Sequence, residues 1–212
     1  AVSSVIGKLL STILLNRLIE FRKFNCPDSS NQLGFSKGAQ TYDHILTMQT
    51  IASKYKRLKK QVFAVFVDFK KAFDSVCRQA LFYKLANSGI TGKFYNFLRD
   101  MYSNSVAQIK LSGFVSNVIN ILKGTEQGHP LSPDLFKLFL NDLSELLNID
   151  HNCPELMDRL ISHLLWADDL ILLSLDPETC QVQINKLIAY CNKWGIEIND
   201  LKTKAVIFGR DK

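Results

Sequence analysis

The chain lacks any Cys-x-x-Cys pair, and its number of cysteines is odd. They are Cys26, Cys77, Cys153, Cys180 and Cys191. Zinc clusters and disulfide frameworks both need cysteines at paired spacings. We therefore expect no zinc cluster in this chain, and reduced thiols in a reducing compartment. This predicts an intracellular protein of the cytoplasm, the nucleus or both, not a secreted one.

Long apolar runs are also missing, because no stretch reaches the roughly 18 consecutive apolar residues of a membrane helix. Residues 2–21 could be mistaken for a signal peptide. Lys8 and Arg17 interrupt this stretch, and its apolar residues recur at helical spacing. We predict an amphipathic helix over about residues 3–24 and no membrane partner. The first residue is not Met and the chain starts within this pattern, so we expect a fragment.

The composition fits one compact unit. The chain has 212 residues, of which 47% are hydrophobic. This is enough for one large domain or two small lobes with a sizeable core. The formal net charge is +6 and the isoelectric point is about 9.0. Such a charge suits a polyanionic partner without proving one. No feature of the sequence indicates an oligomeric state.

The most informative segment is LLWADDLILLS, Leu164–Ser174. Two adjacent acids, Asp168 and Asp169, stand between apolar runs that predict two strands. Two carboxylates pressed together in a buried hairpin raise each other's pKa. A divalent cation removes this cost, and Mg²⁺ binds carboxylate oxygens together with substrate phosphates. Two such ions can hold the attacking and leaving oxygens of a phosphoryl transfer. The alternative is a polar hairpin tip in a globular domain.

A metal-bound acid pair needs a further carboxylate from elsewhere in the chain. The β-branched and aromatic run Val62–Phe69 predicts a strand with an acid, Asp68, near its end. The following residues, Lys70–Leu85, carry apolar side chains at helical spacing. Asp74 would lie near the start of this helix, where its charge suits the helix dipole. We expect Asp68 to face a cleft and Asp74 to be structural.

Other segments predict the remaining elements. We expect helices over about residues 41–60, 92–102, 132–147 and 177–194. Ser132 is expected as an N-cap, with Pro133 as the first helical residue and Asp134 in the first turn. Residues 106–121 alternate and contain a Ser-Gly turn, which predicts a hairpin. A polar loop is expected around residues 150–155 and a closing strand pair over residues 196–208.

The basic run KYKRLKK, Lys54–Lys60, has two interpretations. It could be a solvated helix end, where cations offset the C-terminal dipole. It could equally bind nucleic acid through Lys56, Arg57, Lys59 and Lys60, because phosphates supply most of the affinity in such complexes.

Five segments in order resemble the reverse transcriptase domain of a non-LTR (LINE-type) retrotransposon. They are GFSKGAQTYDHI (Gly34–Ile45), VDFKKAFDSV (Val67–Val76), GTEQGHPLSPDLF (Gly124–Phe136), WADD (Trp166–Asp169) and WGIEINDLKTKAVIFG (Trp194–Gly209). The resemblance covers nearly the whole chain. It implies an α+β fold, with a right-hand polymerase palm (an antiparallel sheet with helices on one face) plus partial fingers. The fingers part would be residues 1–61 and the palm residues 62–212, with the thumb and endonuclease absent.

The resemblance also implies an activity, that of an RNA-directed DNA polymerase. Such an enzyme adds deoxynucleoside triphosphates to the 3′-OH of a DNA primer on an RNA template, with two Mg²⁺ ions or Mn²⁺ in their place. Asp68 and Asp168 would bridge the metal ions, and Asp169 would be a third, less direct ligand. Lys202 would act as the acid toward the leaving pyrophosphate, although a mobile surface lysine is the alternative.

The same resemblance indicates a nucleotide-binding set. Its members are Phe69, Lys70, Lys71, Ala72, Phe73, Gln127 and Gly128. The backbone from Phe69 to Ala72 would lie along the triphosphate. The ring of Phe73 would collide with a ribose 2′-OH and so exclude RNA precursors. A core aromatic at helical spacing is the rival interpretation of Phe73.

Four residues depart from the family's pattern. Ser36 and Glu126 stand where basic residues are usual, His129 where a small residue is, and Trp166 where Tyr or Phe is. Losing a positive charge a few ångströms from a polyanion costs about one to several kcal/mol. A catalytically decayed remnant that keeps the fold and at most binds nucleic acid is therefore the alternative function.

Overall fold

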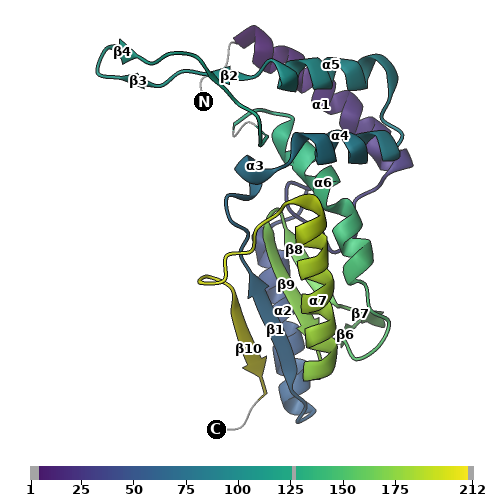
Figure 1. Ribbon diagram of the computed structural model, residues 1–212. Helices are drawn as coiled ribbons and strands as arrows, with labels where there is room; N and C mark the ends of the chain where they lie inside the picture. The colour runs from purple at the N-terminus through teal and green to yellow at the C-terminus, as the bar shows by residue number, and fades with distance from the viewer. Residues whose placement is uncertain (1–4, 126–127, 210–212) are drawn as a thin grey trace.

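The computed structural model describes residues 5–125 and 128–209 (Figure 1). In chain order, the helices of these residues are α1 (Val5–Asn25), α2 (Thr41–Arg57), α3 (Ala72–Ser75), α4 (Arg78–Asn87), α5 (Gly92–Ser103), α6 (Ser132–Leu147) and α7 (Pro177–Trp194). The longer strands are β1 (Val62–Val67), β8 (His163–Trp166), β9 (Asp169–Ser174) and β10 (Lys204–Phe208). Two-residue strands are β2 (Val106–Ala107), β3 (Lys110–Leu111), β4 (Phe114–Val115), β5 (Ile119–Asn120), β6 (Glu155–Leu156) and β7 (Arg159–Leu160).

The four longer strands form one antiparallel sheet in the order β10-β1-β9-β8. In the register of β1 and β9, Val67 lies opposite Leu170. The residue after β1, Asp68, and the first residues of β9 therefore lie at the same end of the sheet. This juxtaposition brings together two segments that are a hundred positions apart in the sequence.

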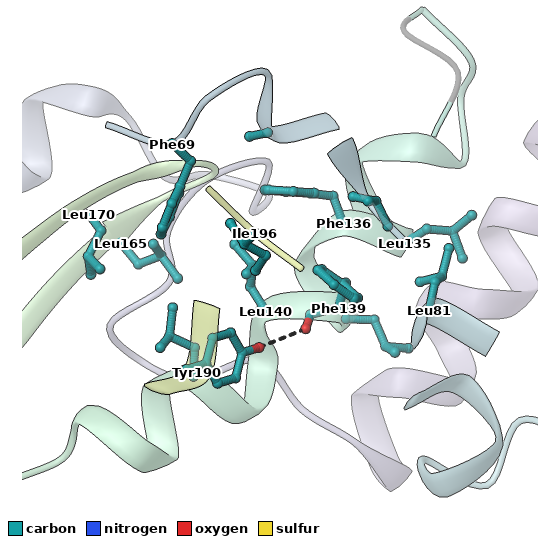
Figure 2. Packing of buried hydrophobic residues seen from close by; sticks show 14 of the residues in the cluster. Phe69, Leu81, Leu135, Phe136, Phe139, Leu140, Leu165, Leu170, Tyr190 and Ile196 are labelled. Atoms are coloured by element: carbon teal, nitrogen blue, oxygen red, sulfur yellow. Dashed lines mark hydrogen bonds between the residues drawn. The ribbon is translucent and has the colours of Figure 1, made fainter. Parts of the chain in front are cut away.

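Alternate residues of β1 face two different apolar clusters, as expected for a strand buried on both faces. Val65 and Val67 belong to the larger cluster, which joins the sheet to α6 and α7. Figure 2 shows this packing between Leu165 and Leu170 of the sheet and Tyr190 of α7. Helix α7 packs on this face of the sheet, and α6 packs on α7 and extends the cluster toward α4. Helix α2 adds a cover on the other face, where Ile51 and Tyr55 join Val62 and Ala64.

Helix α7 has the predicted range, and a capping residue lies at each end. The Asp176 carboxylate accepts a hydrogen bond from the Thr179 N–H at 2.7 Å, which satisfies a free donor of the first turn. Pro177 occupies the first turn, and Gly195 ends the helix with a φ of 71°. The hairpin around the acid pair was also predicted and forms as β8 and β9.

The predicted helix over residues 70–85 is wrong as a single element. It divides into α3 and α4, with Val76 between them in a non-helical conformation. Lys71 before α3 has a φ of 46°, which a continuous helix does not allow. The carbonyls of Phe73 and Val76 accept hydrogen bonds from Thr125 and Gly124. Contacts with a distant segment therefore replace the helical hydrogen bonds.

Three other predictions need correction. The closing strand pair is a single strand, β10, which pairs with β1, and before it only Ile198 forms a bridge, with Phe69. The loop around residues 150–155 leads into a short hairpin, β6–β7. Helix α6 starts at Ser132 with Leu131 as the N-cap residue, one position from the prediction and within the usual uncertainty of helix ends.

The predicted hairpin over residues 106–121 is confirmed as a projecting element, called the arm below (Figure 1). Its turn residues Ser112 and Gly113 both have positive φ, at 45° and 89°. Such a two-residue turn matches the twist of paired strands. Apolar side chains on the arm are exposed, with Leu111 at 72% and Phe114 at 82%.

The predicted amphipathic helix is α1, which buries Leu14 and Leu18. Its first turns leave Val5, Ile6 and Leu9 exposed by 83%, 80% and 63%. Among the residues that the structure describes, none of the helices combines the length and apolar character that a membrane crossing requires. All five cysteines lie in the described ranges and have free thiols.

Candidate functional site

A cavity of about 750 Å³ opens at the end of the sheet where β1 ends and β9 begins. Its lining comes from three segments that are far apart in the sequence: the residues after β1, the turn between β8 and β9, and the loop before β10. The lining residues are Asp68, Phe69, Lys70, Lys71, Ala72, Phe73, Asp74, Ser75, Asp168, Glu197, Asn199 and Lys202. Eight of the residues predicted from the sequence therefore border one space.

Asp68 is held at the cavity by the loop before β10. Asn199 donates a hydrogen bond from Nδ2 to the Asp68 carboxylate at 2.9 Å, and its backbone N–H donates to the Asp68 carbonyl at 2.7 Å. The Asp68 N–H donates to the Thr203 hydroxyl at 3.3 Å. Lys202 Nζ lies 3.9 Å from the other carboxylate oxygen. The carboxylate thus has a fixed orientation and a nearby cation.

The second acid segment is the acid turn, defined as residues 166–169. Trp166, the last residue of β8, pairs with Asp169, the first residue of β9. Ala167 and Asp168 connect the two strands. Asp168 borders the cavity. Partial burial raises the pKa of Asp169, and the negative charges of Asp168 and Asp68 raise it further. The charge of Asp68 therefore acts on Asp169, although the two residues come from distant segments.

The donor chemistry of this end of the sheet suits a hard divalent cation. Mg²⁺ is commonly bound by one or two carboxylates, with substrate phosphates and water completing its shell. Asp68 and Asp168 supply two carboxylates to one cavity. Within the described ranges, no three His, Cys, Asp or Glu side chains gather closely enough to form a metal site by themselves. A fit to Mg²⁺ thus depends on ligands that a substrate would bring.

The segment after β1 lines the cavity with its backbone and two lysines. The Lys70 N–H donates to the Glu197 carbonyl at 2.8 Å, and Lys70 Nζ lies 3.6 Å from the Glu197 carboxylate. Lys71 adopts the left-handed conformation, which is uncommon outside glycine and concentrates at functional sites. The segment is thus held by Glu197 of the loop before β10, and it brings positive charge to a cavity that is also lined by acids.

Phe73 borders the cavity and also packs against the core. Its ring stacks on Phe136 with centroids 4.3 Å apart and meets Phe35 edge-on at 6.2 Å. These contacts fix its position, as aromatic pairs do. Both interpretations of Phe73, a gate beside the nucleotide and a core aromatic, are compatible with this placement.

The loop before α6 contributes less than the sequence indicated. Gln127, and with it Glu126, lies outside the described residues. Gly128 is described, with a φ of 84°, and does not border the cavity. His129 Nε2 lies 2.8 Å from the Ser11 hydroxyl, so the residue that departs from the family's pattern connects this loop to α1.

The basic run lies at the opposite end of β1 from Asp68. Lys56 and Lys59 border a separate cavity of about 400 Å³ next to residues 207–209 of β10 and the loop after it. The two ends of a six-residue strand are about 20 Å apart. Helix α2 ends at Arg57, earlier than predicted, and Lys59 has a φ of 53°. The run is therefore no part of the acidic cavity.

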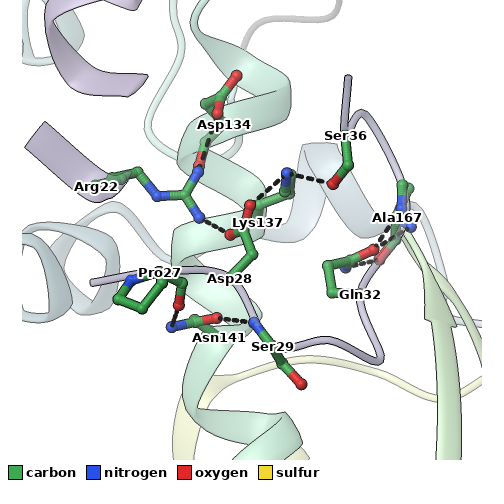
Figure 3. A network of polar contacts seen from close by, with 11 residues as sticks. Arg22, Pro27, Asp28, Ser29, Gln32, Ser36, Asp134, Lys137, Asn141 and Ala167 are labelled. Carbon is green, nitrogen blue, oxygen red and sulfur yellow. Dashed lines mark hydrogen bonds and ion pairs between the residues drawn. The ribbon is translucent and has the colours of Figure 1, made fainter. Parts of the chain in front are cut away.

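Ser36, where the family usually has a basic residue, contacts a buried lysine. Lys137 donates a hydrogen bond to the Ser36 hydroxyl at 3.1 Å and pairs with Asp28 at 2.6 Å (Figure 3). Arg22 pairs with Asp28 and, at 2.9 Å, with Asp134. The position thus keeps a cation beside it, although this cation already pairs with an acid.

Sequence analysis missed several residues that build the site. Asn199 and Thr203 orient Asp68, and Glu197 fixes Lys70. All three lie in the segment that resembles the family near Lys202, so their place in the motif was the available signal. Gln32 contacts the acid turn from a loop that precedes the first matching motif.

The fold is that of the palm of a right-hand polymerase. It superimposes on a truncated apo telomerase of Candida tropicalis with a TM-score of 0.67 at 16% sequence identity, covering 96% of this chain and 41% of that one. Telomerase of Candida albicans, determined in complex with a TWJ fragment of telomeric RNA, gives a TM-score of 0.68 at 13% identity, covering 96% and 35%. At these identities the likeness concerns the fold alone.

The chain belongs to the reverse transcriptase family. The profile described as "Reverse transcriptase (RNA-dependent DNA polymerase)" matches residues 1–209. Similar curated proteins are the R2 retrotransposon polyproteins of Bradysia coprophila, 28% identical over 172 residues, and Popillia japonica, 30% over 155 residues. The polymerase of the mobile element jockey of Drosophila melanogaster is 23% identical over 209 residues. The identification as a non-LTR retrotransposon reverse transcriptase domain is confirmed.

These matches cover most of this chain and a small part of each relative. They cover 80%, 72% and 96% of this chain, in the same order, and 20%, 26% and 22% of the relatives. The chain thus spans about a fifth to a quarter of the relatives' length.

Proposed function

We propose that this chain is the nucleotidyl-transfer core of an RNA-directed DNA polymerase of a non-LTR retrotransposon. Its substrates would be an RNA template, a DNA primer and deoxynucleoside triphosphates. The observation that carries the proposal is that Asp68 and Asp168, from segments that the family motifs contain, border one cavity with Lys70, Lys71 and Lys202. Residues 1–61 would be part of the fingers and residues 62–212 the palm.

The proposed metal ligands are Asp68 and Asp168, with Asp169 as a weaker third. Two bound Mg²⁺ ions, or Mn²⁺ in their place, would lower the pKa of the primer 3′-OH and neutralise charge on the leaving pyrophosphate. The protein's part is positioning. Asn199 holds the Asp68 carboxylate in one orientation. Lys202, whose Nζ lies 3.9 Å from the same carboxylate, would give a proton to the leaving group.

The nucleotide would lie along the segment after β1. The backbone of residues 69–72 and the amines of Lys70 and Lys71 would contact the triphosphate. Phe73, fixed by its stack on Phe136, would occupy the space of a ribose 2′-OH. Gln127 and Gly128 would contact the incoming nucleotide from the loop before α6. These roles rest on the shared cavity and the family motifs.

Single-turnover extension of a DNA primer on an RNA template, with protein in excess and Mg²⁺ or Mn²⁺ present, tests the proposal. We expect Asp168→Asn to reduce extension by about 10³-fold, the scale of one lost electrostatic contact in a transition state. Asp74→Asn is the matched control, because Asp74 borders the same cavity and the charge change is the same. Equal losses from both variants would argue against a specific role for Asp168.

A decayed remnant is the second candidate function. Ser36 supplies no charge of its own, and Lys137 beside it already pairs with Asp28. Glu126 also adds a negative charge to the loop before α6, at a position outside the described residues. The remnant would bind an RNA–DNA duplex without extending the primer. Extension that appears only after Ser36→Arg and Glu126→Arg would identify a decayed copy with sound catalytic acids.

The basic run is proposed as a separate nucleic-acid contact. Lys56 and Lys59 border one cavity with β10, so the run has a defined surface to present to phosphates. Replacing Lys56, Arg57, Lys59 and Lys60 with Ala should flatten the salt dependence of duplex binding, because fewer counterions are released. An unchanged slope would assign the run to solvation.

Five free cysteines support the reducing, intracellular location proposed for the protein.

A further inference from the structure

A short length of the N-terminal segment lies along the edge of the sheet next to the acid turn. This edge segment, residues 31–34, pairs with β8 outside the regular ladder. The Leu33 N–H donates to the Leu165 carbonyl at 3.0 Å, and the Leu165 N–H donates to the Asn31 carbonyl at 2.8 Å. The edge segment thus ends immediately beside Ala167, the residue that precedes Asp168.

Gln32 in this segment directs its whole side-chain amide at the acid turn. Its Oε1 accepts hydrogen bonds from the Ala167 N–H at 3.1 Å and from the Gly34 N–H at 2.8 Å. Its Nε2 donates to the Ala167 carbonyl at 3.3 Å (Figure 3). Gln32 is only 4% exposed, so water does not compete for these bonds. Both backbone polar groups of Ala167 are therefore held by one buried side chain.

The conformation that Gln32 holds is one that alanine rarely adopts. Ala167 has a φ of 56°, in the left-handed region. Such a residue persists where its surroundings over-determine it. Gly34 adds a second constraint, because a Cβ there would lie 2.1 Å from the Ala167 nitrogen. Only glycine allows the two backbones to approach this closely.

The loop that contains the edge segment is itself fixed to the helices. Asp28, just before it, pairs with Arg22 of α1 and Lys137 of α6. Lys137 also donates to the hydroxyl of Ser36, just after it. Figure 3 shows this network on both sides of Gln32. The edge segment is therefore a rigid support for the turn it contacts.

We infer that Gln32 is the positioning residue of the acid pair: it holds Ala167 in the strained conformation that directs Asp168 into the cavity. Gln32 would touch neither substrate nor metal. The proposal rests on the proposed function only for the metal readout described below. It predicts an effect on the acid turn that exceeds the general effect of losing a buried amide.

The chain offers a matched control at the other end of the same hairpin. Gln183 of α7 is fully buried and donates to the carbonyls of Ser162 and Leu173, at 2.8 Å and 3.2 Å. Gln183→Leu and Gln32→Leu each remove one buried side-chain amide that forms hydrogen bonds with the β8–β9 hairpin or the residue before it. Only Gln32→Leu removes contacts to Ala167.

The first experiment measures amide hydrogen exchange by NMR in the full chain. We expect the Ala167 N–H to exchange at least about 10-fold faster in Gln32→Leu than in Gln183→Leu, after correction for the global stability of each variant. Equal protection of Ala167 in the two variants would overturn the proposal. If Gln32→Leu does not fold, Gln32→Met replaces it and Gln183→Met is its control, because methionine is close to glutamine in shape and has no amide. The Ala167 N–H should again exchange at least about 10-fold faster in Gln32→Met than in Gln183→Met. Equal protection of Ala167 in these two variants would overturn the proposal.

The second experiment measures binding of Mn²⁺ alone by electron paramagnetic resonance. We expect Gln32→Leu to weaken Mn²⁺ binding about 10-fold, the lower end of the effect of losing a group that supports a metal ligand. Gln183→Leu should leave the affinity unchanged, and equal losses would overturn the proposal. If the wild-type chain binds no Mn²⁺ by itself, Asp68 and Asp168 do not hold a metal ion without the ligands that a substrate brings. The exchange experiment then still decides the role of Gln32.

Discussion

Two hairpins of this chain turn through two residues each, and they stabilise their turns in different ways. The arm turns at Ser112 and Gly113, both with positive φ, and its glycine adopts this conformation freely. The acid turn uses Ala167, which does not. Gln32 holds it from outside. A turn on the surface is thus specified by its own residues, whereas the acid turn depends on a segment more than a hundred positions away.

The two hairpins also differ in what their side chains contact. Leu165 in β8 is 1% exposed and belongs to the main core, whereas Leu111 in β3 is 72% exposed. The buried hairpin therefore obtains its stability from packing. The difference teaches that the acid pair joins two strands that are packed into the core, whereas the turn of the arm joins two strands that are exposed to water.

The largest expected effect comes from truncating one leucine in each hairpin. Leu165→Ala should lower the free energy of unfolding by about 2–5 kcal/mol, because it leaves a cavity in the core. Leu111→Ala should change it by no more than about 0.5 kcal/mol, because the side chain already contacts water. Urea unfolding measures both. Similar losses would mean that the arm packs against something in solution.

The second expected difference concerns pH. His163 at the start of β8 is fully buried, and burial lowers its pKa to about 4 from an ordinary value of 6.5. The unfolded chain therefore binds the proton first as the pH falls, and stability is lost between about pH 6.5 and 4, by at most about 3 kcal/mol. The arm, residues 106–121, contains no Asp, Glu or His.

The variant His163→Leu should make unfolding less sensitive to pH in this window, and urea unfolding at several pH values measures the difference from the wild type. Other titrating groups contribute equally to both proteins and cancel. Parallel pH profiles would show that His163 is charged in the folded protein or reaches water.

The third expected difference separates two glycines. Gly34→Ala should cost about 1–3 kcal/mol or more, because the new methyl group would lie 2.1 Å from a backbone nitrogen of the acid turn. Gly113→Ala on the arm should cost about 1–2 kcal/mol, since it places alanine at a φ of 89° with no atom within 4 Å of the new carbon. Only Gly34→Ala should shift the NMR resonances of Ala167. A shift caused by Gly113→Ala would contradict the separation of the two hairpins.

Local patterns predicted the elements whose signals lie within one segment. Apolar residues at helical spacing predicted α7, and the apolar runs around Asp168 predicted the β8–β9 hairpin. The family motifs indicated which segments would meet, and eight of the predicted site residues do border one cavity. Their chemical roles stay predictions.

The elements that sequence analysis missed depend on distant partners. The helix over residues 70–85 divides because the backbone N–H groups of residues 124–125 donate hydrogen bonds to the carbonyls of Phe73 and Val76. The loop before β10 is irregular because Asn199 bonds to Asp68 instead of extending a strand. The spacing of residues within a segment cannot predict these contacts, because each contact depends on where a distant segment lies in the folded chain.

The exposed apolar side chains at the start of α1 have a consequence for handling the purified protein. Val5, Ile6 and Leu9 lie within two turns of one helix, each more than 60% exposed. Contiguous apolar surface of this kind promotes self-association. High ionic strength would strengthen this tendency by screening the repulsion that a net charge of +6 provides. Dilute protein at moderate salt, with replacements such as Ile6→Glu and Leu9→Lys, would keep the chain dispersed at the concentrations that spectroscopy needs.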